Sequence, residues 1–522
     1  MQQDEHERPR QRLDPQPNAR RPSAAPGPKH DVSAQFLLLA TVAFFVARIS
    51  LIPLRVFDPD EFEHSHAAWS VFKGLLPYRD FFEHHTPWYY FGLSPFFHWF
   101  AVDQTFESAR HFLLFGRVVS LVLAALSVVL VIAVGRLVAH RRVGLLTGLF
   151  VAAQPVFIQK TLEIRPDVPA LLFFVAALWF LLRGLLEVGE AATSRLRWFL
   201  GGGLCLGAAI MCTQKMLFVL PGAFLGLGLW ALAGGRRALG ARAFAVLIVG
   251  LGVAVPALFT WIGFAIQGGG RQFLYNNFFL NARFQLRSFR GVQATLKTSW
   301  PILVLSLLGA GVALYRFSRA KQRRYGDVLL LCILGGLIAG IVLVPVVYEQ
   351  YCLVPLSIAC LFAAQGLSFL VDLVQERARA WVLVCAILPL SALPVLNLAW
   401  SFNHRNDRQL ARLRYVFEHT GPADTVLDGW LGTQVFRPAP LYYFFMHREL
   451  LGALPDRDKE AYLGPLESGK VRPSLITLDD ELLALGPRFS TFLRTHYVTN
   501  DGLFYFPLRT PPTTTDQNRQ RL

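Results

Sequence analysis

Long apolar stretches recur along most of this 522-residue chain, and short polar or basic connections separate them. A helix needs about 20 predominantly apolar residues to cross a bilayer, so the repeated stretches predict an all-α polytopic membrane protein. Backbone polar groups find no partner in lipid, and each span is therefore expected to be helical. We expect eleven spans, at residues 36–54, 112–139, 143–159, 168–186, 198–213, 216–233, 243–266, 301–315, 327–347, 352–371 and 381–400.

Two segments of the first long connection, 55–111, are expected to lie at the membrane surface. The stretch 88–100 is apolar, but its roughly 13 residues are too few to cross. Ahead of it, residues 64–76 carry apolar side chains at helical spacing. This spacing predicts an amphipathic juxtamembrane helix that ends at Pro77.

The two ends of the chain differ from the spans in composition. Residues 1–33 are rich in Pro, Arg and Gln and predict a disordered cytoplasmic leader. Residues 34–401 form the predicted membrane domain, and residues 402–506 alternate strand-like and helical patches that predict a small α/β domain. Asn500-Asp501-Gly502 predicts a hairpin turn in this domain. Residues 507–522 are expected to form a flexible tail.

Charge sets the orientation of the predicted membrane domain. The chain is 53% hydrophobic and 16% charged, whereas soluble proteins are about 25% charged. Lys and Arg concentrate in every second connection, and the positive-inside rule places these turns and the leader in the cytoplasm. The connection 55–111 and the C-terminal domain then face outward from the plasma membrane. This topology explains the net charge of +16, and no nucleic-acid-binding motif accompanies it.

An acidic cluster, Asp58-Pro59-Asp60-Glu61, follows the first span directly. Carboxylates are costly beside hydrocarbon, and a chain that keeps three of them at the membrane boundary is expected to use them. Asp58 and Glu63 are more readily explained as solvated or helix-capping acids. Asp60 and Glu61 are the preferred functional residues.

Histidines and acids gather in the same connection. Glu83, His84 and His85 are candidate ligands of a divalent metal ion, because imidazole and carboxylate groups are typical zinc ligands. His64 and His66 could join them, but a solvated helix face explains that pair equally well.

Cations are predicted on the same outer face. Arg165 and Asp167 follow the third span, where a plain ion pair that caps the next helix is an equal alternative. Lys215 lies between the fifth and sixth spans, where it could simply snorkel to the interface. Loop 267–300 contains basic residues and no acid. Arg283, Arg287 and Arg290 follow one another at helical spacings of four and three, which predicts a basic stripe on one helix face. This stripe predicts binding of an anionic ligand such as a lipid phosphate, or a general attraction to membrane headgroups.

Sugar transfer from a polyprenyl-phosphate donor needs this set of groups. A carboxylate must take the proton of an acceptor hydroxyl, and cations must stabilise the charge that builds on the departing phosphate. Asp60 is the expected base, and Glu61 and Asp167 would position the acceptor or a metal ion. The expected donor-phosphate ligands are Arg165, Lys215, Arg271, Arg283 and Arg287.

The order of these motifs resembles that of the bacterial protein O-mannosyltransferase and aminoarabinose-transferase superfamily, the GT-C membrane glycosyltransferases. The similarity covers roughly residues 35–380. The motifs that carry it are Asp58-Pro59-Asp60-Glu61, Phe82-Glu83-His84-His85-Thr86-Pro87, Gly116-Arg117, Arg165-Pro166-Asp167 and Thr213-Gln214-Lys215.

The resemblance implies a GT-C fold, an isoprenoid-phosphate-linked donor and inversion at the sugar. It gives Asp60 the catalytic role, with Asp167 beside it. In the aminoarabinose branch, the residue that matches Glu83 helps to hold a metal and is followed by a lysine. This sequence has histidines there, and loop 267–300 lacks the second metal histidine of that branch.

Two other classes of function stay open. A transporter or flippase of lipid-linked sugars would be expected to show inverted repeats and broken helices near the midplane of the bilayer, whereas the ionisable residues here crowd one rim. A non-enzymatic subunit of an envelope complex would tolerate Asp60→Asn. For the glycosyltransferase, the expected partners are the lipid-linked donor, membrane lipids, and an acceptor lipid, protein or polysaccharide.

Overall fold

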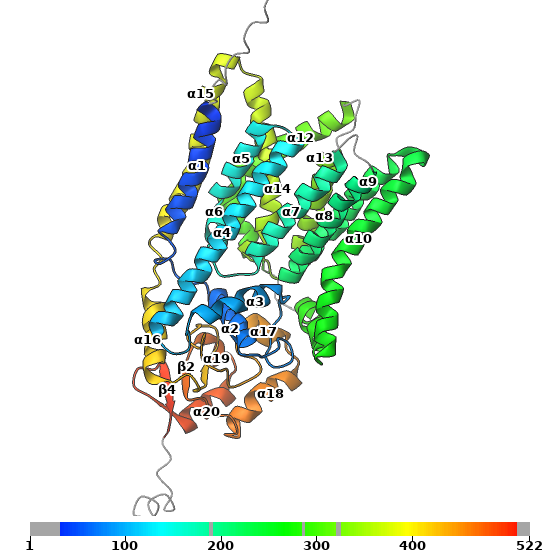
Figure 1. The fold of residues 1–522 in the computed structure, drawn as a ribbon. Helices are drawn as coiled ribbons and strands as arrows, with labels where there is room; N and C mark the ends of the chain where they lie inside the picture. The colour runs from blue at the N-terminus through cyan, green and yellow to red at the C-terminus, as the bar shows by residue number, and fades with distance from the viewer. Residues whose placement is uncertain (1–31, 187–191, 284–287, 320–324, 509–522) are drawn as a thin grey trace, which may run out of the picture.

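The computed structural model describes residues 32–186, 192–283, 288–319 and 325–508. Within these ranges the chain forms a bundle of long helices with a smaller mixed region at one end (Figure 1). We call that end the site end of the bundle. The predicted leader up to residue 31, the tail from residue 509 and Arg287 lie outside the described residues.

Eight described helical segments are long and apolar enough to cross a membrane. They are α4 (Phe106–Val138), α7 (Asp167–Leu186), η2 (Gln214–Phe218) with α9 (Val219–Leu232), α10 (Gly235–Ile266), α12 (Arg290–Arg319), α13 (Tyr325–Leu343), η5 (Glu349–Cys352) with α14 (Leu353–Asp372), and η6 (Glu376–Ala378) with α15 (Arg379–Ser401).

The other three expected spans also form helices of the bundle. They are α1 (Val32–Ile49), α5 (Arg141–Ala153) with α6 (Pro155–Lys160), and α8 (Ala192–Cys212). The third span is divided because Gln154 leaves the helical conformation before Pro155, which starts α6. α5 packs against α4 and α14, and α8 packs against α7 and α10. The polytopic helical fold is therefore confirmed.

The connection 55–111 folds at the site end of the bundle. It contains α2 (Pro59–Phe72), α3 (Trp88–Leu93) and the 3₁₀ helix η1 (Ser94–Trp99). The prediction of a surface helix was wrong, because α2 is buried from Glu61 to Ser70. The chain around 435–446 covers it, with His66 stacked on Phe444 at 4.4 Å between ring centroids.

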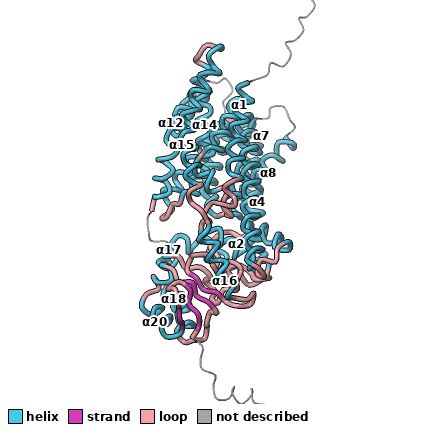
Figure 2. The backbone as a smooth tube through the Cα atoms, turned by 90° about the vertical axis from the view of Figure 1, so that its left-hand side faces the viewer, coloured by secondary structure: helices cyan, strands magenta, loops and turns pink. Residues whose placement is uncertain are grey.

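The C-terminal region adds a four-stranded sheet with the strand order β1-β2-β4-β3, in which β1 and β2 are parallel. Figure 2 shows its strands beyond the site end of the helices. The elements are α16 (Asp407–His419), β1 (Val426–Asp428), α17 (Arg448–Ala453), α18 (Asp456–Glu467), β2 (Leu475–Thr477), α19 (Asp480–Leu483), α20 (Pro487–His496), β3 (Tyr497–Thr499) and β4 (Phe504–Pro507). The predicted turn joins β3 to β4, with Gly502 at φ +73°.

The C-terminal region shares one hydrophobic core with the connection 55–111. Phe62, Phe97 and Phe112 belong to the same buried cluster as Phe436 and Phe444. The ring centroids of Phe97, in the connection, and Phe436 lie 5.9 Å apart. Because their core is common, the two regions together form a single cap on the site end of the bundle.

Candidate functional site

The acidic cluster begins helix α2 through a capping box. Oδ1 of Asp58 accepts a hydrogen bond from the backbone N–H of Asp60 at 3.2 Å, and the Glu61 carboxylate accepts one from the backbone N–H of Asp58 at 3.0 Å. Pro59 occupies the first helical turn, where its missing N–H is not needed. This local chemistry holds Asp60 at the helix N-terminus, which favours negative charge.

Glu61 turns away from the site and binds the bundle. Its two carboxylate oxygens accept hydrogen bonds from Nε and Nη2 of Arg117 at 2.9 and 2.7 Å, and both side chains are fully buried. Glu61 also accepts the backbone N–H of Ile164 at 3.2 Å. The predicted role of Glu61 in positioning acceptor or metal was therefore wrong. A buried, saturated carboxylate has no face left for a ligand.

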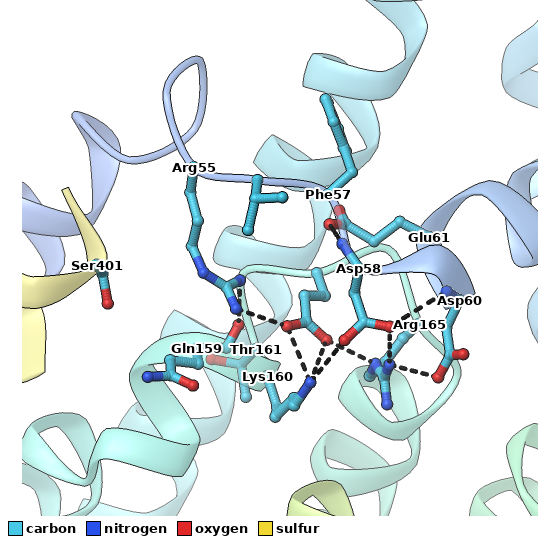
Figure 3. A network of polar contacts seen from close by, with 12 residues as sticks. Arg55, Phe57, Asp58, Asp60, Glu61, Gln159, Lys160, Thr161, Arg165 and Ser401 are labelled. Carbon is cyan, nitrogen blue, oxygen red and sulfur yellow. Dashed lines mark hydrogen bonds and ion pairs between the residues drawn. The ribbon is translucent and has the colours of Figure 1, made fainter. Parts of the chain in front are cut away.

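Asp60 joins a network of ion pairs centred on Arg165 (Figure 3). Nη2 of Arg165 lies 2.6 Å from Oδ2 of Asp60, and its Nε lies 3.0 Å from Glu163. Burial disfavours the charge of Arg165, but the carboxylates of Asp60 and Glu163 outweigh it and raise the pKa of the guanidinium. Since Arg165 is only 1% exposed and already paired, it holds the carboxylates in place, and the prediction that it binds donor phosphate is not supported.

Lys160 and Lys215 extend this network on either side. Nζ of Lys160 lies 2.8 Å from Oδ2 of Asp58, and Nζ of Lys215 lies 3.0 Å from Oδ1 of Asp167. Nζ of Lys215 also lies 4.4 Å from the ring centroid of Tyr351. The charged members are the carboxylates Asp58, Asp60, Glu163 and Asp167 and the cations Arg55, Lys160, Arg165 and Lys215. The network is therefore close to neutral.

The network faces a cavity of about 540 Å³ at the site end of the bundle. Asp58, Asp60, Lys160, Arg165 and Lys215 all line it. One wall is apolar and consists of Leu217, Phe218, Phe278, Leu343, Val344, Pro345 and Val346. The cavity therefore joins a charged floor to a surface suited to hydrocarbon.

Close helix packing supports the apolar wall. A Cβ atom at Gly222 would meet the carbonyl group of Cys332, and one at Gly340 would meet the ring of Phe218. Small residues let membrane helices approach closely. The contacts of α9 with α13 thereby fix Phe218 and Leu343, which line the cavity from these two segments.

A second group of acids and histidines lies next to the ion-pair network. Glu63, His64, Glu83 and His85 each offer a ligand atom, and these atoms all lie within 4.8 Å of one another. Nδ1 of His85 lies 3.0 Å from Oε1 of Glu83, and Nδ1 of His64 lies 3.1 Å from the Tyr90 hydroxyl. Two carboxylates and two imidazoles are a typical donor set for a divalent cation.

Two buried oxygen atoms in this group indicate that it fits a cation. Oε1 of Glu63 and Oε2 of Glu83 are buried and have no hydrogen-bond partner among the described residues. Burial and the nearby carboxylates of Glu83 and Asp60 raise the pKa of Glu63 well above its usual value. Ionisation of Glu63 is therefore unfavourable in the absence of a cation, and a divalent cation bound beside it would stabilise the charged carboxylate.

Two other candidate histidines do not belong to this group of four. His84 lies beside it, with its ring centroid 4.1 Å from that of His85 and its Nδ1 3.9 Å from Oε1 of Glu83. Nδ1 of His66 lies 3.1 Å from the carbonyl oxygen of Val435. Burial lowers the pKa of His66 to about 4, so that its ring stays neutral in the core of the cap. The group of four therefore contains Glu83 and His85 of the predicted set, together with Glu63 and His64.

The predicted basic stripe of loop 267–300 is not a single helix. α11 (Gly270–Leu274), a π-helix (Tyr275–Leu280) and a 3₁₀ turn (Asn281–Arg283) follow one another. Arg271 and Arg283 are exposed, and neither lines the cavity. Nη1 of Arg283 donates to the Tyr275 hydroxyl at 3.1 Å. These two arginines therefore do not lie where donor phosphate would meet Asp60.

Sequence reasoning missed several cavity residues. Lys160 ends α6, just before the acidic and basic run 163–167. Its closeness in sequence to this run could have identified it as a candidate site residue. Tyr348 lies in the connection before η5, and Trp430, His447 and Glu449 come from the C-terminal region. No local pattern marks the three residues of the C-terminal region, because they are brought to the site only by the fold.

Comparison with known proteins gives a match at the level of family and fold. Residues 109–261 match the family described as dolichyl-phosphate-mannose-protein mannosyltransferase. No curated protein matches the chain in sequence.

Solved structures share the fold over nearly the whole chain. ArnT from Cupriavidus metallidurans bound to undecaprenyl phosphate superposes with a TM-score of 0.59 and 12% identity, covering 92% of this chain and 99% of its own. The oligosaccharyltransferase AglB from Archaeoglobus fulgidus, in complex with an inhibitory peptide and a dolichol-phosphate, gives 0.57 and 14%, covering 92% and 75%. The chain therefore shares the expected fold with these two structures.

Proposed function

We propose that this protein moves a sugar from a polyprenyl-phosphate donor to an acceptor hydroxyl at the outer face of the plasma membrane. The observation that carries the proposal is the position of Asp60. It lines one cavity together with Lys215 and an apolar wall, so base, cation and lipid surface meet in a single space. The fold supports the same class of reaction.

Asp60 is the proposed general base. Its Oδ2 is held by Arg165, whereas its Oδ1 receives no hydrogen bond from the described part of the chain. The side chain is 21% exposed toward the cavity. Oδ1 is therefore available to accept the proton of an acceptor hydroxyl as the oxygen attacks the anomeric carbon. Attack opposite the departing phosphate would invert the configuration at that carbon.

Lys215 is the proposed ligand of the donor phosphate. Within the described part of the chain its ammonium group pairs with one carboxylate, that of Asp167, and it lines the cavity beside Phe218 of the apolar wall. A donor whose hydrocarbon lies on that wall would place its phosphate near Lys215. The cation would then stabilise the negative charge of the leaving phosphate.

A divalent cation held by Glu63, His64, Glu83 and His85 completes the proposal. When bound there, it would supply positive charge to a site that must accept an anionic donor. Glu83 also accepts hydrogen bonds from the backbone N–H groups of His84 and His85 at 2.8 and 3.0 Å. These bonds hold the carboxylate in place for a ligand. The proposed orientation, with the site on the outer face of the membrane, follows from the concentration of Lys and Arg in every second connection.

The test is sugar transfer by purified full-length protein with a panel of undecaprenyl-phosphate sugars. Asp60→Asn keeps the shape of the side chain but removes the proton acceptor. Loss of a general base commonly lowers the rate by about 10² to 10⁴, while donor binding should be retained. Wild-type turnover in the variant would exclude Asp60 as the base. Movement of intact donor across vesicle membranes without transfer would favour a flippase instead.

A further inference from the structure

The catalytic cavity has a second wall, formed by three residues of the cap and by Tyr348 from the connection before η5. Trp430, His447, Glu449 and Tyr348 line it, and we call these four residues the outer wall. The ring centroids of Trp430 and His447 lie 5.1 Å apart, and Nδ1 of His447 lies 3.1 Å from Oε2 of Glu449. Tyr348 is 39% exposed. The outer wall therefore combines two aromatic side chains with a carboxylate and an imidazole.

The outer wall is continuous with the proposed base. Burial, followed by the carboxylates of Glu449 and Asp60, raises the pKa of Tyr348 above its usual range. Both acids thus lie within electrostatic reach of its hydroxyl group, which stays protonated and able to donate a hydrogen bond. A ligand in contact with Glu449 and Tyr348 would also approach Asp60.

The loop that carries Trp430 is held firmly by the sheet. The backbone N–H of Trp430 donates to Oδ2 of Asp479 at 2.7 Å. Farther along the loop, Oδ2 of Asp428 accepts the Thr433 hydroxyl at 2.7 Å and the backbone N–H of Gln434 at 3.1 Å. Asp428 and Asp479 follow the parallel strands β1 and β2 at their carboxyl ends. Hydrogen bonds therefore hold in place the loop that presents the indole of Trp430 to the cavity.

Gly432 adds a close approach that fixes the same loop. It has φ +82°, and a Cβ atom there would collide with the ring of Phe62 on α2. The loop therefore rests directly on the helix whose N-terminus carries Asp60. The loop of Trp430 and the helix of Asp60 are therefore packed directly against each other at this contact.

We propose that the outer wall is the binding site for a sugar ring of a carbohydrate acceptor. The C–H face of a pyranose packs on the negative face of an indole or phenol ring. Its hydroxyls hydrogen bond to carboxylate, imidazole and phenol groups, and Glu449, His447 and Tyr348 offer all three. A few polar groups within an apolar frame are the usual makeup of a small-molecule site.

The position of the outer wall assigns it to the acceptor, and this step rests on the proposed function. Lys215 and the apolar wall belong to the bundle, and they serve the phosphate and lipid of the donor. Trp430, His447 and Glu449 belong to the cap. Glu449 is in α17, which lies beyond the site end of the bundle helices (Figure 1). The attacking hydroxyl must approach the anomeric carbon from the side away from the phosphate, and the cap supplies that side.

The test measures sugar binding apart from transfer. Saturation-transfer NMR on the purified full-length protein, with methyl glycosides as probes and a Ser/Thr peptide as comparison, reports binding in the absence of donor. Trp430→Ala and Glu449→Gln should each weaken the binding of a methyl glycoside at least ten-fold, and Trp430→Phe should retain part of it. Leu431→Ala is the matched control, since Leu431 lies in the same loop but does not line the catalytic cavity.

Transfer assays with the same variants complete the test. Trp430→Ala should raise the KM for the sugar acceptor at least ten-fold and leave the KM for the donor unchanged. Equal glycoside binding by wild type and Trp430→Ala, or binding of the peptide alone, would overturn the carbohydrate site. Glycoside binding that depends on Trp430, without transfer from any donor, would support the outer wall and refute the proposed function.

Discussion

Glu61 and Arg117 form a bidentate ion pair in the floor of the cap, where both side chains are fully buried. Arg117 also donates to the carbonyl oxygens of Ile52 and Val56, so the pair joins α4 to the start of the connection 55–111. The neighbouring carboxylate, Asp60, lies in the catalytic cavity. Adjacent acids in one helical turn thus have different surroundings, one buried in an ion pair and one lining the cavity.

The first prediction concerns the stability of this pair. Glu61→Gln leaves the Arg117 guanidinium buried without a counter-charge, and breaking a buried pair in this way costs about 3–5 kcal/mol. We expect a clear fall in the melting temperature of the purified protein. Arg117→Met should have a similar effect, because it leaves Glu61 unpaired.

Arg110→Met is the matched control for this prediction. Arg110 lies on the same helix, and its pair with Glu107 is exposed to solvent. Exposed pairs contribute little to stability, so the melting temperature should hardly change. A Glu61→Gln protein that melts like wild type but fails to transfer sugar would restore the catalytic role expected from the sequence.

The second prediction is that cation binding depends on pH. Glu63 has a raised pKa, caused first by burial and then by Glu83 and Asp60, so protons compete with a cation for its carboxylate. Affinity should therefore fall as the pH is lowered and rise as the pH is raised. Protein washed after exposure to Zn²⁺ or Mn²⁺ should retain more metal at pH 7.5 than at pH 5 by elemental analysis.

Substitution of the proposed metal ligands tests, in the same experiment, where the retained metal is bound. Glu63→Gln and Glu83→Gln should each abolish retained metal at either pH, whereas Glu107→Gln, on the exposed start of α4, should leave it unchanged. Equal metal content in all three variants would show that the cation binds elsewhere.

The third prediction separates Lys215 from Arg283 as donor-phosphate ligands. A hydrogen bond to a charged group contributes about 1.5–3 kcal/mol, so Lys215→Met should raise the donor KM roughly ten-fold or more. Arg283→Gln should leave that KM unchanged, because Arg283 is exposed and does not line the cavity. The opposite ranking, measured with one undecaprenyl-phosphate sugar, would return the phosphate site to the basic loop.

Residues close together in sequence were the easiest to interpret correctly. The apolar stretches predicted the helical bundle because length and composition alone decide whether a segment suits a membrane. Asp60, Asp167 and Lys215 follow or precede such stretches. The bundle brings Asp60 and Lys215 to one cavity, and Asp167 is paired with Lys215 beside it. Helix ends on one side of a membrane must lie near one plane, which is why simple topology anticipated this grouping.

Other features depend on contacts that no local pattern encodes. The stripe expected in loop 267–300 assumed α-helical spacing, and the π-helix at Tyr275–Leu280 removes that spacing. Both consecutive histidines, 84 and 85, lie near Glu83, but only His85 belongs to the close group of four candidate ligands. Trp430 reaches the cavity through a sheet formed far along the chain. The hydrophobic core shared by the cap, and not a sequence motif, determines its position.

The last prediction concerns which face of the membrane carries the cavity. Gln104 lies in the connection that folds at the site end, and Asp456 begins α18 of the cap; both are exposed. Arg237 lies at the start of α10, at the opposite end of the bundle (Figure 1). An impermeant thiol reagent applied to intact cells should label Gln104→Cys and Asp456→Cys but not Arg237→Cys.

Native cysteines that react with the reagent would add a background signal to this labelling experiment. Cys385 is the exposed one among the six cysteines, and it lies in the apolar helix α15. Cys385→Ala therefore serves as the parent for all three variants. The Arg237→Cys protein should become labelled once the membrane is permeabilised, which shows that its thiol is reactive. Labelling of Arg237→Cys in intact cells, with Asp456→Cys protected, would place the cavity in the cytoplasm and overturn an outward-facing transferase.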